Sequence, residues 1–165
     1  MIKYFKWNNL YSFRDEGEIS FEVNQNAPKT NAFVDYDRVR LSKINSVFGA
    51  NASGKTNVLN ALFFIYNFIV HSFHFKDKGF FNYSPYMMND EGSEFEVSFL
   101  IDKVCYIYSF SVNKEVVLSE KLQKKDINKD TNLKTVFKRH GQAFQNLNFN
   151  NQTNEHQEIN YAQFN

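Results

Sequence analysis

The stretch "VFGANASGKTN", Val47 to Asn57, decides how the rest of the chain is interpreted. It contains the pattern G-x-x-x-x-G-K-T, which predicts a loop that holds the phosphates of a nucleotide. Glycines let the backbone adopt positive φ values, and successive backbone N–H groups then point into one anion-binding concavity. The apolar stretch from Ile44 to Gly49 predicts a strand before the loop.

A helical pattern follows the loop, from Lys55 to about Phe73. It is apolar on nearly all sides, which predicts a helix buried inside a larger α/β structure. We expect Lys55 to reach the β- and γ-phosphates and the Thr56 hydroxyl to hold a Mg²⁺ ion that bridges them. The bare pattern also occurs in strand-to-helix turns that bind no ligand, but a strand before it and a helix after it favour phosphate binding. The predicted binding residues are Gly49, Ala50, Asn51, Ala52, Ser53, Gly54, Lys55, Thr56 and Asn57.

Composition restricts the class of protein only partly. The length of 165 residues suits one domain, and the net charge of +1 argues neither for nor against nucleic acid or membrane. The single cysteine, Cys105, excludes an internal disulfide and a cysteine metal site, which is typical of the reducing cytoplasm. The apolar run from Ala61 to Val70 has about half of the roughly 20 residues that a membrane-spanning helix needs. We expect a cytoplasmic protein that does not enter a membrane.

Alternating apolar residues predict strands on both sides of the loop and helix. Two-residue breaks between the later strands predict antiparallel hairpins, and a last hairpin turns at His140 and Gly141. Residues 146–165 are rich in Asn and Gln, which predicts a disordered tail or an unfinished connection. The expected strands are Ile2 to Trp7, Glu18 to Val23, Glu94 to Ile101, Val104 to Val112 and Glu115 to Leu122, and the hairpin is Thr135 to Gln145.

Three parts of the chain together resemble one family. The loop "GANASGKTN" resembles the G-x-N-x-S-G-K-[ST]-N form of the ABC-type ATPase heads in SMC, RecF and OLD-like proteins. The segment "IKYFKWNNLYSFRDEGEISF" resembles the opening of such heads, a strand, then N-F-[KR]-S-F, then a second strand. The segment "EFEVSFLIDKVCYIYSFSVNKEVVLSEKL" resembles their antiparallel lobe, and "VFKRHGQAF" is similar to the next hairpin. The likeness covers about residues 1–145 and is greatest to the AAA-family ATPases of OLD and related phage-defence systems.

The resemblance implies a fold, ligands and partners. The implied fold class is α/β of the mixed α+β kind, the N-terminal half of a P-loop NTPase with an antiparallel lobe beside the loop. Residues 1–145 would form an incomplete head lobe and 146–165 the polar tail. The implied ligands are ATP and Mg²⁺, and the complete protein would be an ATPase. Its heads would pair as a homodimer and control an effector, such as DNA or a nuclease, in phage defence or DNA repair.

One residue of the opening segment departs from the family pattern. Where N-F-[KR]-S-F has a basic residue, this chain has Tyr11 in "NLYSF". Its ring could stack on a nucleotide base or pack locally, and the sequence does not choose between these alternatives.

A hydrolytic head of this class also needs residues that the sequence does not supply. It needs an apolar strand ending in Asp-Glu, and a Ser-Gly-Gly-type signature at a helix start. "SFLIDK" imitates the first, but Asp102 is followed by Lys103 where a hairpin turn is expected. Gln142 is interpreted as a turn residue of the last hairpin. We therefore expect the N-terminal half of a head, with weak or no hydrolysis by itself.

The remaining polar clusters have simpler interpretations. His71 and His74 are three apart, but no third metal ligand is evident, and the dipole favours His at a helix C-terminus. Cys105 is interpreted as a small core residue. A basic cluster with interleaved aspartates favours a solvated loop over a DNA contact, and it comprises Lys121, Lys124, Lys125 and Lys129.

Two other functions remain open. The chain could be a non-catalytic interaction module that pairs with a partner chain, which the missing Asp-Glu strand favours. A P-loop kinase with unusual N-terminal strands is a third alternative. The 48 residues before Gly49 disfavour it, because small kinases and Ras-like GTPases place this loop after their first strand.

Overall fold

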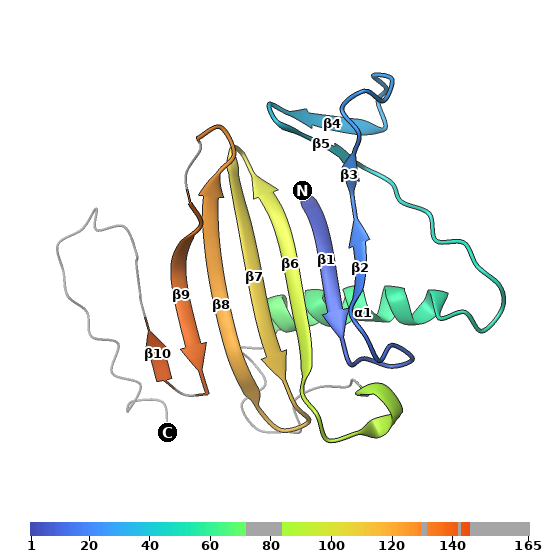
Figure 1. Cartoon of the computed structure of the whole chain (residues 1–165), viewed down its shortest axis with the longest axis vertical. Helices are drawn as coiled ribbons and strands as arrows, with labels where there is room; N and C mark the ends of the chain where they lie inside the picture. Colours follow the sequence, from blue (N-terminus) through green and yellow to red (C-terminus); the bar gives the residue numbers. More distant parts are fainter. Residues whose placement is uncertain (72–83, 130–131, 142, 146–165) are drawn as a thin grey trace.

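The computed structural model describes residues 1–71, 84–129, 132–141 and 143–145. A seven-stranded sheet has the strand order β10-β9-β8-β7-β6-β1-β2, and one helix, α1, crosses one of its faces (Figure 1). A second sheet of three strands has the order β3-β5-β4 and lies at one end of the large sheet. The elements are β1 (Ile2–Asn8), β2 (Gly17–Ser20), β3 (Glu22–Val23), β4 (Phe33–Tyr36), β5 (Val39–Ser42), α1 (Lys55–His71), the 3-10 turn η2 (Tyr86–Met88), β6 (Ser93–Ile101), β7 (Val104–Val112), β8 (Val117–Asp126), β9 (Lys134–His140) and β10 (Ala143–Gln145).

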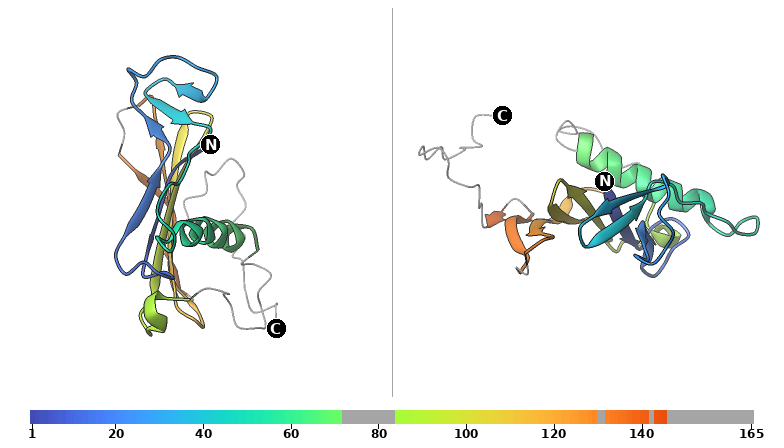
Figure 2. Two further views of the ribbon diagram at one scale, coloured as in Figure 1. Left: turned by 90° about the vertical axis from the view of Figure 1, so that its right-hand side faces the viewer. Right: turned by 90° about the horizontal axis from the view of Figure 1, so that it is seen from above.

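The core lies between α1 and the large sheet. Because side chains alternate between the faces of a strand, one face of each central strand is apolar and meets the helix. The ring of Phe68 stacks on that of Phe110 with centroids 3.9 Å apart, and Phe64 lies 4.7 Å from Phe95. Figure 2 shows the helix on one side of the sheet only. The fold class is thus mixed, mostly strands with one helix in the described part.

The hairpins predicted from short breaks are confirmed. All neighbouring strands of the large sheet run antiparallel, and β6 turns into β7 at Asp102 and Lys103. Asp102 has φ 52°, a turn conformation that Asp tolerates better than most residues. Gly141 has φ 53° in the turn between β9 and β10. The expected strand Glu18 to Val23 is divided into β2 and β3 at Phe21, and the expected strand Glu115 to Leu122 is observed as Val117–Asp126.

The predicted strand from Ile44 to Gly49 is wrong. These residues form no ladder with any described strand, since they leave β5 and run past the end of the sheet toward α1 (Figure 1). The side chain of Ile44 is 72% exposed and that of Phe48 is 90% exposed. An apolar sequence becomes a strand only where a neighbour supplies backbone hydrogen bonds. Here the contact with the end of β2 is made by a side chain, since Asn45 Nδ2 donates to the Ser20 carbonyl at 2.9 Å.

The predicted all-round burial of the helix is also wrong. Ala61, Phe64, Ile65 and Phe68 are buried against the sheet, but the opposite side of α1 faces outward. The reason is geometric, because a single sheet face can cover only one side of a helix. The large apolar side chains exposed on α1 are Leu59, Phe63, Tyr66, Ile69 and Val70.

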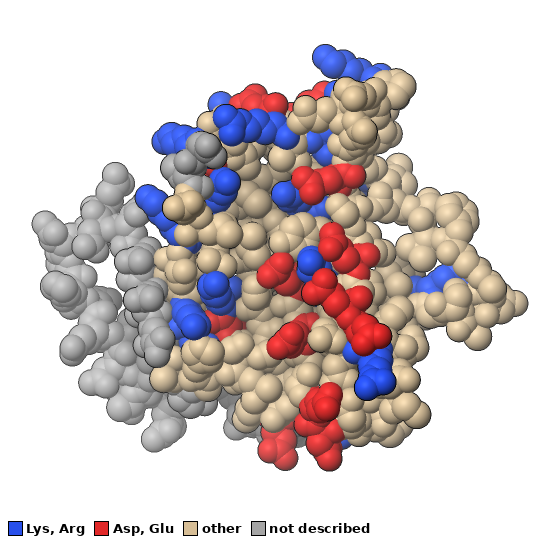
Figure 3. Space-filling view, viewed as in Figure 1, with Lys and Arg blue, Asp and Glu red and all other residues tan. Residues whose placement is uncertain are grey.

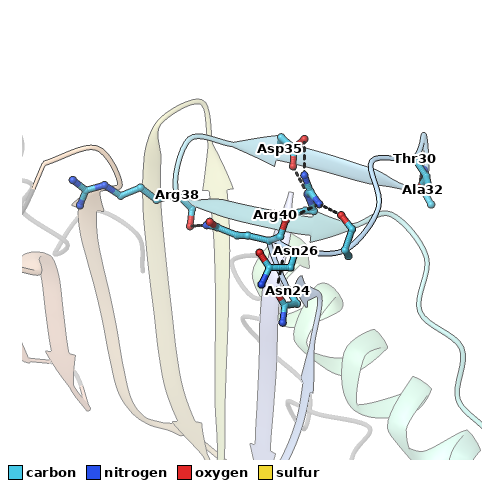
Figure 4. Close-up of polar contacts among 9 residues, drawn as sticks. Asn24, Asn26, Thr30, Ala32, Asp35, Arg38 and Arg40 are labelled. Atoms are coloured by element: carbon cyan, nitrogen blue, oxygen red, sulfur yellow. Dashed lines mark hydrogen bonds and ion pairs between the residues drawn. The ribbon is translucent and has the colours of Figure 1, made fainter.

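The small sheet contains a hairpin, β4 and β5, that the sequence did not predict. Arg40 of β5 is only 7% exposed, and its guanidinium group donates from Nε to Asp35 Oδ1 at 2.5 Å. Arg40 Nη1 donates to the carbonyls of Gln25 at 3.2 Å and Ala27 at 2.6 Å (Figure 4). The hydrogen bond from Arg40 lowers the pKa of Asp35 below its usual value. One buried cation therefore fastens the polar loop before β4 to the hairpin.

Candidate functional site

The nine residues predicted to bind phosphate form one continuous loop and the start of a helix. The loop extends beyond the edge of the large sheet, and α1 begins at Lys55, as predicted (Figure 1). Ala52 has φ 61° and Gly54 has φ 88°, so the chain reverses within the loop. The N–H of Ser53 donates to the Ala50 carbonyl at 3.3 Å, and the N–H of Val58 donates to the Gly54 carbonyl at 3.1 Å. The second of these bonds starts the helix.

The side chain of Lys55 folds back over this loop. Its Nζ donates to the carbonyl of Gly49 at 2.9 Å and to that of Ala50 at 2.6 Å. A Cβ at Gly49 would lie 2.6 Å from Ser53 Oγ, so a larger residue would displace the Ser53 side chain. The ammonium group is thus held at the mouth of the loop by two neutral acceptors, which a charged phosphate oxygen can replace with stronger hydrogen bonds.

The electrostatics at the start of α1 favour an anion. The first helical turn contains no acidic residue, so nothing there offsets the positive end of the helix dipole. The first N–H groups of a helix have no partner within it and are free to donate outward. Thr56 is exposed and Asn57 is half-buried at this end of the helix. Thr56 is therefore accessible to a ligand that enters the loop.

A turn from the N-terminal strands supports the loop, and sequence reasoning missed this role. Asn57 Nδ2 donates to Ser12 Oγ at 2.9 Å. A Cβ at Gly54 would lie 3.2 Å from both Ser12 Oγ and Phe13 Cζ, so a side chain there would crowd the turn, and the φ of 88° also favours glycine. The motif "NLYSF" marked the turn in the sequence, but a contact across 45 positions is visible only in the fold.

Tyr11, the departure in that motif, packs locally. Tyr11 has φ 51°, and its N–H donates to the Ser84 carbonyl at 2.8 Å. Its ring packs against the hydrophobic core. Burial raises the pKa of Tyr11 above its usual value. The structure therefore favours local packing of Tyr11 over stacking on a base.

Two other residues of interest, His71 and Cys105, do not contribute to the loop. His71 ends α1, and in the described part of the chain no three His, Cys, Asp or Glu side chains come together as metal ligands. Cys105 is half-buried in β7, 3.4 Å from Ser98 Oγ. His74, Gln142 and the tail lie outside the described residues. The prediction that the basic cluster forms a loop is wrong. Three of its lysines belong to strand β8, and only Lys129 lies in a turn; the three are Lys121, Lys124 and Lys125.

No helix in the described part of the chain has both the length and the apolar character needed to cross a membrane.

Comparison with known proteins assigns a family to this chain. Residues 44–160 match the family model described as "AAA domain, putative AbiEii toxin, Type IV TA system". Searches of curated proteins and of solved structures give no significant match. The matched region begins at the apolar stretch before the loop and covers more than half of the chain. The chain therefore belongs to this family of AAA domains, which are P-loop ATPase-like, nucleotide-binding domains.

Proposed function

We propose that the chain binds ATP, together with Mg²⁺, at residues 49–57. The observation that carries the proposal is the position of Lys55 Nζ, held over the loop by the Gly49 and Ala50 carbonyls at the positive end of α1. A phosphate placed there meets an ammonium group, free helix N–H groups and a backbone that glycine leaves open.

Each part of the site has a separate role in this proposal. Lys55 Nζ exchanges its two carbonyl acceptors for oxygens of the β- and γ-phosphates. The backbone N–H groups of the loop and of the first helical turn bind the remaining phosphate oxygens. The Thr56 hydroxyl is exposed beside them and would hold Mg²⁺, which neutralises phosphate charge when it is bound.

We further propose that the domain is the ATP-binding part of an SMC/RecF/OLD-like ATPase. The support is the contact of the "NLYSF" turn with the loop, through Ser12 and Asn57, because it joins two of the segments that carry the resemblance. In this proposal, ATP brings two heads together in the cytoplasm and controls an effector, in phage defence or DNA repair. Hydrolysis would use an Asp-Glu strand and a signature motif, which these 165 residues do not contain.

Titration with Mg-ATP tests the binding site. We expect Lys55→Ala to weaken binding by about tenfold or more, because one charge-assisted contact to phosphate is worth roughly 1.5–3 kcal/mol. Lys103→Ala is the matched control, since it removes the same charge from the exposed turn between β6 and β7. Equal affinity of the wild type and Lys55→Ala would contradict the proposed site.

A second candidate function is a non-catalytic module that pairs with a partner chain. The outward side of α1 supports it, because the apolar residues Leu59 and Phe63 are 62% and 65% exposed. Measuring the molecular mass in solution with and without Mg-ATP separates the two functions. Pairing that ignores nucleotide supports the module, whereas pairing that requires nucleotide supports the ATP-dependent head.

A further inference from the structure

A basic hollow lies on the large sheet, far from the loop that precedes α1. It has a volume of about 210 Å³ and is formed by β7, β8, the turn after β8 and the start of β9. The strand register places Tyr106 and Lys124 on the same face as Phe110, which packs against α1. Figure 2 shows that the helix crosses only part of this face, and Figure 1 shows that it leaves the end of the sheet beside the turn between β8 and β9 without a helix. Its lining includes one aromatic ring, one carboxylate and four ammonium groups, from Tyr106, Asp126, Lys124, Lys125, Lys129 and Lys134.

Two of these lysines face each other across neighbouring strands. Lys124 of β8 is the direct partner of Lys134 of β9. Like charges at directly opposite positions destabilise a sheet, unless an anion lies between them. Among the residues that the structure describes, no carboxylate lies within 4.0 Å of Lys124, Lys125 or Lys134. The fold therefore concentrates positive charge at this hollow.

The one carboxylate in the hollow is already engaged. Asp126 Oδ1 accepts the backbone N–H of Asn128 at 2.9 Å, and Asp126 Oδ2 lies 3.5 Å from Lys129 Nζ. Asp126 thus closes the turn after β8 and pairs with a single lysine. Three positive charges remain for a ligand.

An aromatic surface adjoins the charges. The ring of Tyr106 is half-buried and stacks on Phe99, with centroids 5.4 Å apart and an interplanar angle of 13°. Tyr106 is also the direct strand partner of Lys124, so ring and ammonium group lie side by side on one face. A flat ring beside basic groups on an open sheet is an arrangement that stacks nucleobases and holds the phosphates between them.

The opposite face of the sheet carries negative charge over β1 and β6. Acidic side chains gather there over β1 and β6, as Figure 3 shows, and they include Glu94 and Glu96. A polyanion is repelled from that region and attracted to the basic hollow. This asymmetry selects the face that a nucleic acid would approach.

We propose that the hollow at Tyr106, Lys124 and Lys134 binds single-stranded nucleic acid through its phosphodiester backbone. Lys124 and Lys134 hold successive phosphates, and one base stacks on the exposed side of the Tyr106 ring. The site does not use the loop at residues 49–57, so it stands whether or not ATP binds there.

Binding of a labelled oligonucleotide by the full chain tests this proposal. The probe is a fluorescein-labelled oligodeoxythymidylate of about 15 nucleotides, followed by anisotropy at several salt concentrations. We expect the double variant Lys124→Ala/Lys134→Ala to weaken binding about tenfold or more. We also expect it to reduce the salt dependence, d log K/d log[salt], by about 1.4, because each contact to a single strand contributes about 0.7.

The two strands offer a closely matched control on the other face. Lys121 of β8 is the direct partner of Lys138 of β9, so Lys121→Ala/Lys138→Ala removes the same charges in the same cross-strand geometry. We expect this control to keep the affinity of the wild type. Equal loss in both double variants would overturn the proposal, since it would show that only the overall charge matters.

Two further binding measurements show where the oligonucleotide binds and whether free phosphate is enough to occupy the hollow. Lys55→Ala should bind the oligonucleotide as well as the wild type does, and loss of binding would place the oligonucleotide at the loop instead. Inorganic phosphate at the same phosphate concentration should leave the probe bound, and its release would reduce the hollow to a site for free phosphate. Thermal unfolding of every variant shows whether the fold is intact, and relief of the Lys–Lys repulsion should keep both double variants at least as stable as the wild type.

Discussion

The two sides of α1 have similar residues and opposite environments. The inward side carries Phe64 and Phe68, which are buried against Phe95 and Phe110 of the sheet. The outward side carries Phe63 and Tyr66, which are 65% and 56% exposed. Apolar composition alone therefore does not decide which side of the helix is buried. The side that faces the large sheet is buried, and the side that faces away from it is exposed.

Truncation of one aromatic residue on each side gives the largest expected difference. Phe68 is 1% exposed and stacks on Phe110, so Phe68→Ala should lower the free energy of unfolding by about 3–5 kcal/mol. Phe63→Ala should change it by about 0.5 kcal/mol or less, because the ring loses little contact. Urea unfolding followed by circular dichroism measures both values.

If Phe68→Ala does not fold, Phe68→Leu and Phe63→Leu preserve the comparison with smaller changes. Equal losses at the two positions would show that the outward side is also packed against protein in solution. The two-sided contrast seen in the structure would then be wrong.

The N-terminal end of α1 differs from both sides of the helix, because a polar contact with the N-terminal turn holds it in place. Asn57 Nδ2 donates to Ser12 Oγ at 2.9 Å, and a neutral hydrogen bond of this kind contributes about 0.5–1.5 kcal/mol to stability. Ser12→Ala and Asn57→Ala should each lower stability by that amount. The double variant should lose less than the sum, since both changes remove the same bond.

The affinity for Mg-ATP can be measured in the same two single variants and the double variant. If Ser12 positions the loop through Asn57, Ser12→Ala weakens nucleotide binding although it contacts no ligand, and Asn57→Ala abolishes the effect of Ser12→Ala. Additive changes in affinity would show that Ser12 does not act on the loop through Asn57. Ser12→Thr keeps the hydroxyl and serves as the conservative control.

Local patterns were sufficient to predict the antiparallel strands. From Glu94 to Val112, alternating residues and a two-residue break specify β6, β7 and the turn at Asp102 almost without error. The start of α1 at Lys55 was equally clear, because the loop pattern sets where a helix begins. In these regions each element finds its partner next to it in the sequence.

Long-range partners account for what the sequence did not predict. The stretch from Ile44 to Phe48 is apolar enough for a strand, yet pairing depends on a neighbour that the pattern cannot reveal. Arg40 gave no signal of burial, because its acceptors Gln25 and Ala27 lie on a loop 13 to 15 positions away. Ser12 was missed for the same reason, since its role appears only when the N-terminal turn meets the loop.

The outward side of α1 provides the smallest expected effect on stability. Phe63→Ser places a polar group where the ring is 65% exposed, so the free energy of unfolding should stay within about 0.5 kcal/mol of the wild-type value. Self-association should nevertheless decrease, because exposed aromatic and aliphatic groups drive contacts between protein surfaces. Light scattering over a range of protein concentrations measures this change, and Lys103→Ser is an exposed control with no apolar surface to lose. Unchanged self-association in Phe63→Ser would show that the exposed ring takes no part in contacts between chains, and the interaction-module alternative would lose its structural support.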